Sequence, residues 1–444
     1  MSIWDNKNNK YFITAVLLIV VVLLRTGWWR TVTFQHKNVL TVGVFSDSYW
    51  NQQNGNQHKF IDSMIKKYEE KNPGIKVVYE KGILKEDYSE WLAEQIIQGT
   101  APDVFIVLPD DFNMLSGIGA LKNLDSIIEK DKSFDPEIFY EAAYAGGKPD
   151  GIRYSLPVEC APDLMFVNRT ILRNEGIDLP DSNWTWDDFY AVCKKVTKDT
   201  DGNGTIDQAG VVDYSWEEAF ASNDVTLFDK ERMECNFTDE KVYDALMFLD
   251  LLDALNRGTG SADISFEHGN VAFQPMNFSS YRRYLGNPVH ASRYADFDWD
   301  YLTMPAGPDG DNASLLDLIS VAMYSGTSME AEAWDFMKML TCNEEIQSEI
   351  FEFSEGISVC RKVTEAELLK ENRLLLGGMA SPNIGALEYT MQKAFFTQRF
   401  SGFNEAVSSV DTAVNDILKS NANIRMEQVI QARNINNFLK TINN

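Results

Sequence analysis

The 444-residue sequence has few histidines and no ordered cysteine pattern, and these shortages exclude several kinds of chemistry. Its four histidines leave little room for a histidine-based metal centre or acid–base site. Its five cysteines are odd in number and include no C-x-x-C pair, so we expect buried free thiols rather than a disulfide scaffold. The cysteines are Cys160, Cys193, Cys235, Cys342 and Cys360.

Positive charge is also scarce. The chain has 40 Lys and Arg residues against 66 Asp and Glu residues, which gives a net charge of −26 at pH 7. Such a chain repels polyanions, so we expect no nucleic acid as a partner. Hydrophobic residues still make up 44% of the sequence, enough to bury the cores of two or three domains.

The familiar enzyme motifs are missing as well. We find no G-x-S-x-G, no H-E-x-x-H, no P-loop and no dinucleotide fingerprint with its flanking strand and helix. Paired carboxylates such as Asp110–Asp111 and Glu217–Glu218 can hydrolyse glycosides. In a chain this acidic, however, neighbouring acids usually form a solvated face. We therefore predict no catalytic residues.

One short apolar run, Tyr11 to Leu24, follows two lysines near the N-terminus. It is shorter than the roughly 20 apolar residues of a membrane span and better fits the core of a signal peptide. No small-x-small cleavage site follows, and Trp28 and Trp29 are residues that favour a membrane interface. We expect residues 1–30 to form an uncleaved signal anchor, with a cleaved signal peptide as the alternative. Either form places the protein at the extracellular face of the membrane or secretes it.

Beyond this segment, β-prone stretches alternate with apolar residues at helical spacing. The expected strands are Val39–Phe45, Ile75–Tyr79 and Asp103–Leu108. The longer helices are expected at Asp187–Val196, Val242–Leu255, Glu330–Leu340 and, near the C-terminus, Asn404–Leu418. This alternation predicts an α/β fold with a mostly parallel sheet.

An aspartate-glycine loop, DTDGNGTID, has the spacing of a calcium loop. Its oxygen ligands would come from Asp199, Asp201, Asn203, the Thr205 carbonyl and Asp207. The twelfth position is Gly210, so the usual bidentate glutamate is missing and a remote acid would have to complete the shell. The alternative is a tight turn that caps its own backbone. We favour a structural Ca²⁺ ion.

Six segments, taken in order, resemble the extracellular solute-binding proteins of ABC transporters, particularly the sugar-binding group that includes maltose-binding protein. The likeness spans about residues 39–420. The segments are Tyr68–Tyr79, Gly99–Leu124, Tyr154–Asn168, Asn183–Phe189, Lys198–Gly210 and Ala331–Leu340.

The resemblance implies a two-lobed, periplasmic-binding-protein-like fold of type II, with a hinge between the lobes. Residues 39–152 and about 305–353 would form lobe 1, and about 153–304 with 354–444 would form lobe 2. Hinge closure buries a ligand between the lobes, and a permease recognises the closed form. A sugar requires polar groups for its hydroxyls and flat aromatic rings for its C–H faces.

The resemblance also implies which residues line the cleft. Asp110 takes the place of the family's acidic ligand contact, and Asp111 that of a second polar contact. The loop after the first strand lies at the cleft edge, and it contains Ser46, Asp47, Tyr49 and Trp50. Further expected contacts are Glu159, Tyr214, Trp216, Phe278 or Tyr281 as a stacking ring, and Tyr389. Trp184 and Trp186 are expected in the core or at a helix cap instead.

Some positions depart from the family pattern. The lipidated cysteine is absent, which leaves the anchoring mode open. The apolar stretch Leu315–Ile319 replaces a glycine-rich one, and Cys160 and Ala161 replace residues that often bind sugar. The specificity can therefore differ from maltodextrins.

The predicted function is capture of a carbohydrate, in particular an oligosaccharide, by a monomer that delivers it to ABC permease subunits. A non-sugar solute on the same fold, such as a polyamine or peptide, is one alternative. A secreted glycoside-acting enzyme is another.

Overall fold

A computed structural model describes most of the chain. The described residues are 38–50, 57–229, 233–257, 264–280, 282, 297–375, 383–397, 399–400, 402–420 and 422–442. The expected N-terminal anchor, residues 1–30, lies outside them. Within the described ranges, no helix combines the length and apolarity needed to cross a bilayer.

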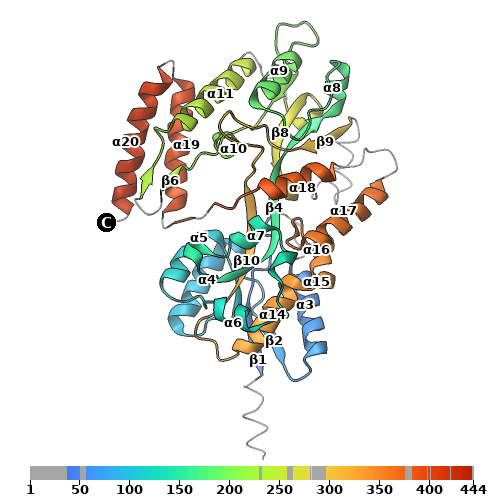
Figure 1. The fold of residues 1–444 in the computed structure, drawn as a ribbon, viewed down its shortest axis with the longest axis vertical. Coiled ribbons are helices and arrows are strands. Elements are labelled where there is room, and N and C mark those ends of the chain that lie inside the picture. Colours follow the sequence, from blue (N-terminus) through green and yellow to red (C-terminus); the bar gives the residue numbers. More distant parts are fainter. Residues whose placement is uncertain are drawn as a thin grey trace, which may run out of the picture.

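The N-terminal strands form one end of the main sheet, in the lower part of Figure 1. Strands β1 (Val39–Gly43), β2 (Lys76–Tyr79) and β3 (Val104–Val107) pair in parallel, with β1 in the middle. The helices between and after them are α3 (Gln57–Lys71), α4 (Lys85–Gln98) and α5 (Pro109–Gly117). Helix α3 ends at Lys71 because Asn72-Pro73-Gly74 follows, and proline and glycine do not continue a helix. The α/β alternation predicted from the sequence is confirmed here.

Two long strands run from this end of the molecule to the other (Figure 1). They are β4 (Ser155–Asn168) and β10 (Leu316–Met323), and β10 pairs antiparallel with the first half of β4. The far end of β4 pairs with β8 (Val271–Asn277) and β9 (Trp299–Leu302), and β5 (Ala209–Val211) pairs with β8. The strand order is β2-β1-β3-β10-β4-β8-β5, and β9 and β11 (Ile357–Ser358) also pair with β4. Each end thus keeps parallel pairs, and the crossing strands add antiparallel ones.

Helices cover both ends of this sheet (Figure 1). Near the upper end lie α8 (Arg169–Asn174), α9 (Trp186–Val196), α10 (Trp216–Ser222), α11 (Glu240–Asn256), α19 (Phe403–Lys419) and α20 (Ile424–Ile442). A small hairpin, β6 (Phe228–Asp229) and β7 (Glu234–Cys235), lies beside them. Nearer the lower end lie α6 (Asp125–Lys130), α7 (Glu141–Ala145), α14 (Glu330–Cys342), α15 (Glu344–Ser348) and α16 (Ile350–Phe353). At mid-height, beside the crossing strands, lie α17 (Arg361–Leu375) and α18 (Ile384–Lys393).

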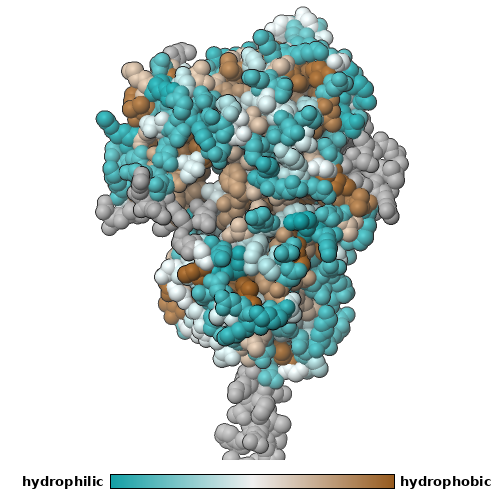
Figure 2. Space-filling view, viewed as in Figure 1, coloured by the Kyte–Doolittle hydropathy of each residue, from teal (hydrophilic) through white to brown (hydrophobic). Residues whose placement is uncertain are grey.

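The buried side chains form two hydrophobic clusters, which we call the cores of lobe 1 and lobe 2. The lobe 1 core includes β1, β3 and α14, and the lobe 2 core includes α9, α11 and α19. Figure 2 shows the surface recessed between the two lobes. Buried residues between Ile357 and Ala394 pack in the lobe 1 core, although the sequence assigns 354–444 to lobe 2. The exact lobe boundaries stay a prediction.

The NWTWDDF segment illustrates how local sequence fixes an element of lobe 2. Thr185 accepts a hydrogen bond from the Asp188 amide, and the Asp188 carboxylate accepts one from the Thr185 amide, which is a capping box at the start of α9. Trp184 donates its indole N–H to the Thr303 carbonyl at 2.9 Å. Trp186 stacks on Phe248 with ring centres 4.4 Å apart. The expectation that both tryptophans serve core and cap is confirmed.

Candidate functional site

The crossing strands place three polar side chains between the lobes. Register brings Asp163 of β4 opposite Asn277 of β8, and Ala161 of β4 opposite Asp317 of β10. The Asn277 side-chain nitrogen lies 3.1 Å from the Asp163 carboxylate and 3.3 Å from that of Asp317. One amide therefore bridges two carboxylates that are far apart in the sequence.

These carboxylates are surrounded by protein and are still reached by water. Burial raises the pKa of Asp163 well above its usual value, and the Asp317 charge adds to this effect. Burial also raises the pKa of Asp317, against the opposing pull of Arg399 and Lys85. Yet the Asp317 side chain is exposed to solvent. A group that water reaches while protein surrounds it lines a cleft rather than a convex surface.

Lobe 1 contributes Asp110 and Asp111 from the first turn of α5, where the helix dipole favours negative charge. The two carboxylates point to different partners. Asp110 forms an ion pair with Arg399, which lies in the segment between α18 and α19. Asp111 accepts a hydrogen bond from the Ser89 hydroxyl at 2.6 Å, and burial raises the Asp111 pKa. Asp110 is thus the better placed of the two to meet a ligand.

The loop after β1 is braced by its own polar side chains. The Ser46 hydroxyl accepts a hydrogen bond from the Gly82 amide at 2.8 Å, and Asp47 accepts one from the Lys85 amide at 2.7 Å. These bonds hold the loop against the start of α4. In this arrangement, both side chains stabilise the conformation of the loop.

Tyr49 follows in the same loop and interacts with the cleft charges. The Lys85 ammonium lies 4.4 Å from the centre of its ring and donates a hydrogen bond to the Tyr49 carbonyl at 2.6 Å. Burial raises the pKa of Tyr49, and the charges of Asp317 and Asp110 raise it further. The ring therefore lies beside the carboxylates of the cleft.

Trp50 and Glu159 lie behind this loop as part of the core. The Trp50 indole donates to Glu159 Oε1 at 2.6 Å, and the Ser354 hydroxyl and the Gly356 amide donate to the same oxygen at 2.6 and 2.7 Å. Glu159 is 1% exposed, and burial raises its pKa to about 7 in spite of these donors. Because Trp50 and Glu159 are hydrogen-bonded to each other, both stabilise the fold whether or not they contact a ligand.

Lobe 2 contributes the start of α10. Trp216 lies at its first turn and points its indole N–H towards Asp411 of α19, 3.4 Å away. Glu217 is exposed, yet burial raises its pKa, helped by the charges of Glu218 and Asp411. Glu217 therefore resembles Asp317: its side chain is surrounded by protein but still accessible to water.

The remaining predicted contacts lie elsewhere. The Tyr214 hydroxyl interacts with Trp186 and Ser222 inside lobe 2. Phe278 is fully buried against Tyr301, so the structure places it in the core. The Tyr389 hydroxyl donates to Asn183 at 3.0 Å on the surface, and Tyr281 lies outside the described residues.

Sequence reasoning missed several of the residues that define the cleft. They are Lys85, Asp163, Asn277, Asp317 and Arg399. A usable signal existed for two of them. Asp317 is the single carboxylate of the apolar strand β10, and Asp163 shares the apolar strand β4 with only one other acid, Glu159. A buried charge in such a strand is costly, so it is expected to be paired or functional.

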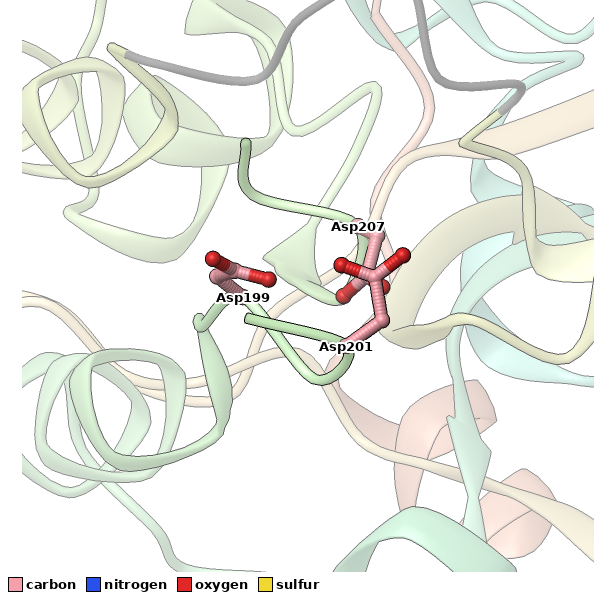
Figure 3. A group of neighbouring side chains, drawn as sticks. All are labelled: Asp199, Asp201 and Asp207. Carbon is pink, nitrogen blue, oxygen red and sulfur yellow. The ribbon is translucent and has the colours of Figure 1, made fainter. Parts of the chain in front are cut away.

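The aspartate-glycine loop folds as a compact turn (Figure 3). Oxygens of Asp199, Asp201 and Asp207 lie within 4.8 Å of one another. The Asp199 carboxylate accepts hydrogen bonds from three backbone amides, of Gly204, Gly202 and Asn203, and these lower its pKa. The loop is therefore well formed by its own hydrogen bonds, and its carboxylates also converge as a cation site requires.

The missing glutamate of this loop has a packing explanation. Gly210 lies in β5, and a Cβ added there would come within 2.6 Å of Cys193 in α9. A glutamate at that position would collide with the backbone of α9 at the buried residue Cys193. Among the described residues, no further acid joins the three aspartates.

Comparison with known proteins places the chain in a family. Residues 54–346 match the model of the bacterial extracellular solute-binding protein family. The chain belongs to this family. Members bind solutes, in keeping with the cleft between two lobes. The expectation drawn from the six sequence segments is confirmed.

Individual relatives of this solute-binding protein include the arabinooligosaccharide-binding protein of Bacillus subtilis, 31% identical over 197 residues. That alignment covers 43% of this chain and only 42% of the relative. Among solved structures, substrate-binding protein Lmo0181 of Listeria monocytogenes, in complex with cycloalternan, has a TM-score of 0.67 at 20% identity. The superposition covers 99% of the Listeria protein and 91% of this chain.

The sugar-binding protein MalE of Xanthomonas citri has a TM-score of 0.74 at 16% identity, with 91% of this chain and 98% of that chain covered. At such identities, the likeness concerns the fold. It confirms the two-lobed α/β architecture for this solute-binding protein.

Proposed function

We propose that this protein captures a saccharide outside the cell and delivers it, unchanged, to the permease of an ABC importer. The observation that carries the proposal is the enclosed, water-accessible site where β4 and β10 pass between the lobes. Family membership supports solute binding. The oligosaccharide named for the Bacillus subtilis relative and the cycloalternan bound to the Listeria protein support a sugar as the solute.

The chemistry of the cleft fits such a ligand. Carboxylates accept hydrogen bonds from sugar hydroxyls, and an amide can both donate and accept. Asp110 of lobe 1, Asp317 of the crossing strand β10 and Asn277 at the end of β8 supply these groups. The half-buried ring of Tyr49 in lobe 1 could meet the C–H surface of a sugar ring if Lys85 moves off its face, and Trp216 of lobe 2 could do so only with its 9% exposed edge.

Closure of the lobes would bring these groups around one molecule. The Asp110–Arg399 ion pair already joins α5 of lobe 1 to the segment that leads into α19 of lobe 2. A saccharide that hydrogen-bonds Asp110 has to share it with this guanidinium. We infer that Arg399 shifts towards the neighbouring Asp317 when a ligand binds.

Family membership supports binding rather than turnover of the sugar. A thermal-shift panel of neutral oligosaccharides, with the sugars analysed afterwards, tests both points. One saccharide at about 100 times its Kd should stabilise the protein by about 2.7 kcal/mol and be recovered intact. If only a polyamine or a peptide stabilises the protein, the solute is not a sugar. If shorter sugars are released, the protein is an enzyme rather than a binding protein.

For localisation, family membership indicates an extracellular protein. We propose that the N-terminal segment tethers it to the membrane as a monomer, beside the permease subunits. The apolar run of the sequence and its flanking tryptophans support this. Membrane fractionation of cells that express the full chain should recover it in the membrane pellet. Its appearance in the culture medium, shortened at the N-terminus, would mean a cleaved signal peptide.

We further propose that the aspartate-glycine loop binds a structural Ca²⁺ ion through Asp199, Asp201 and Asp207, with Asn203 and the Thr205 carbonyl as further ligands. The converging carboxylates support it, since oxygen ligands suit this ion. Titration calorimetry with CaCl₂ should give one site per chain. An absence of binding heat, with no change in melting temperature on adding a chelator, would leave only the self-capped turn.

A further inference from the structure

The charges around the ligand cleft are strongly unbalanced. Lobe 1 contributes Asp110, and the crossing strands contribute Asp163 and Asp317. Lobe 2 contributes carboxylates from the first turn of α10 and from α19, namely Glu217, Glu218 and Asp411. These acids come from five elements, so the fold rather than local sequence brings them together.

The groups are close enough to influence one another. The charges of Asp317 and of both α10 glutamates act on Asp163, and the charges of Asp411 and Asp317 act on Glu217. In each case the neighbouring negative charges raise the pKa, as like charges do when they share an enclosed space. The Asn277 side chain bridges Asp163 and Asp317, and the charges of Asp317 and Asp110 both act on Tyr49. The six carboxylates therefore surround one shared space between the lobes.

Few positive charges offset these acids. Lys85 and Arg399 are the cations that act on Asp317. Lys85 is held over the Tyr49 ring and hydrogen-bonded to the Tyr49 carbonyl. Arg399 is paired with Asp110. Asp163 is left out of the count because burial favours its protonated form. With the other five acids ionised, these two cations leave the described part of the cleft with an excess of three negative charges.

A negatively charged ligand would have to enter this space in an environment where water screens charges poorly. Asp317 and Glu217 are accessible to water but surrounded by protein, so their charges act more strongly than charges on an open surface. Sugar hydroxyls meet no such penalty because they donate hydrogen bonds to carboxylates. An amino group gains both a hydrogen bond and an attraction.

We propose that this cleft selects its saccharide by charge: it admits neutral and amino sugars and rejects sugars that carry a carboxylate or a phosphate. The proposal rests on the saccharide-binding function proposed above and defines the substrate class of the same site. It predicts that uronic-acid oligosaccharides and sugar phosphates are excluded even when their size and linkage match those of a bound neutral sugar.

The test uses three forms of one trisaccharide on the full chain. The first is the uncharged trisaccharide that stabilises the protein most in the thermal-shift panel. The second has one terminal primary alcohol oxidised to a carboxylate, and the third has that alcohol replaced by an amine. Titration calorimetry should find the acid at least about 30-fold weaker than the neutral form and the amine equal or tighter. An acid that binds within threefold of the neutral sugar would overturn the proposal.

A variant shows whether the cleft acids cause the difference. Asp317→Asn with Glu217→Gln keeps side-chain shape and removes two charges, so the ratio of neutral to acid affinity should fall at least fivefold. The matched control, Glu70→Gln with Glu352→Gln, removes two charges from exposed positions on α3 and α16. It should leave the ratio unchanged. An equal fall in both double variants would mean that overall charge, and not the cleft, sets the preference.

Charge selection can still be tested if no neutral sugar binds. Trisaccharides of glucosamine and of galacturonic acid then serve as probes. Binding of the amino form but not of the acid form would support charge selection while the neutral-sugar function fails. Binding of the acid form would overturn charge selection, and binding of neither would overturn both proposals.

Discussion

Replacement of Glu159 by glutamine should remove a pH dependence of stability that one buried carboxyl group creates. Glu159 is 1% exposed, and burial raises its pKa from 4.5 to about 7 although Ser354, Trp50 and Gly356 donate hydrogen bonds to it. A glutamine carbonyl oxygen can accept the same three hydrogen bonds. The substitution therefore removes the titration while it retains most of the geometry.

The direction follows from proton binding. The folded protein holds the Glu159 proton more tightly than the unfolded chain does, so the associated stability is fully present below pH 4.5 and is lost as the pH rises through about 7. At about 1.4 kcal/mol for each pKa unit, the difference between the two pKa values corresponds to roughly 3 kcal/mol. Little screening applies because solvent does not reach the group.

Urea unfolding at pH 5 and pH 8, followed by tryptophan fluorescence, measures this effect. From pH 8 to pH 5, the free energy of unfolding of the wild type should rise by about 2.5 kcal/mol more than that of E159Q, since the last part of the effect appears only below pH 5. Glu352→Gln, an exposed substitution on α16, should behave as the wild type. Parallel pH profiles for the wild type and E159Q would refute the reasoning.

Three further predictions concern the cleft and the calcium loop. Asp110→Asn should weaken saccharide binding by about 10- to 100-fold in calorimetry, because a charged acceptor is lost; unchanged affinity would remove Asp110 from the site. Arg399→Gln should change the stability of the ligand-free protein by less than about 1 kcal/mol, since the ion pair with Asp110 is partly exposed; a larger loss in urea unfolding would mean that the pair holds the lobes together. Gly210→Glu should destabilise the protein by about 2 kcal/mol or more through the clash with Cys193; tighter calcium binding with intact stability would contradict the packing explanation.

Local patterns in the sequence predicted most of the elements well. The expected strands Val39–Phe45 and Asp103–Leu108 correspond to β1 and β3, and the expected helix Asn404–Leu418 corresponds to α19. Amphipathic spacing works for α19 because Val410, Val414 and Ile417 face the lobe 2 core. These features depend on residues that are close together in the chain.

The cleft was harder to predict because strand register creates it. Asp163 and Asn277 are neighbours only because β4 pairs antiparallel with β8, and Asp317 joins them through β10. The resemblance to the family supplied Asp110. It also proposed Glu159, which the structure shows to be buried and bonded to Trp50. A motif can thus locate a segment near the site without showing which side chains face the ligand.

Small-angle scattering of the full chain, with and without the saccharide that stabilises it most, tests the central claim directly. If the two lobes close on the saccharide, the complex should have a smaller radius of gyration than the ligand-free protein. The decrease should be the same at every saturating saccharide concentration. A saccharide that binds with no compaction at all would contradict a cleft that closes around its ligand.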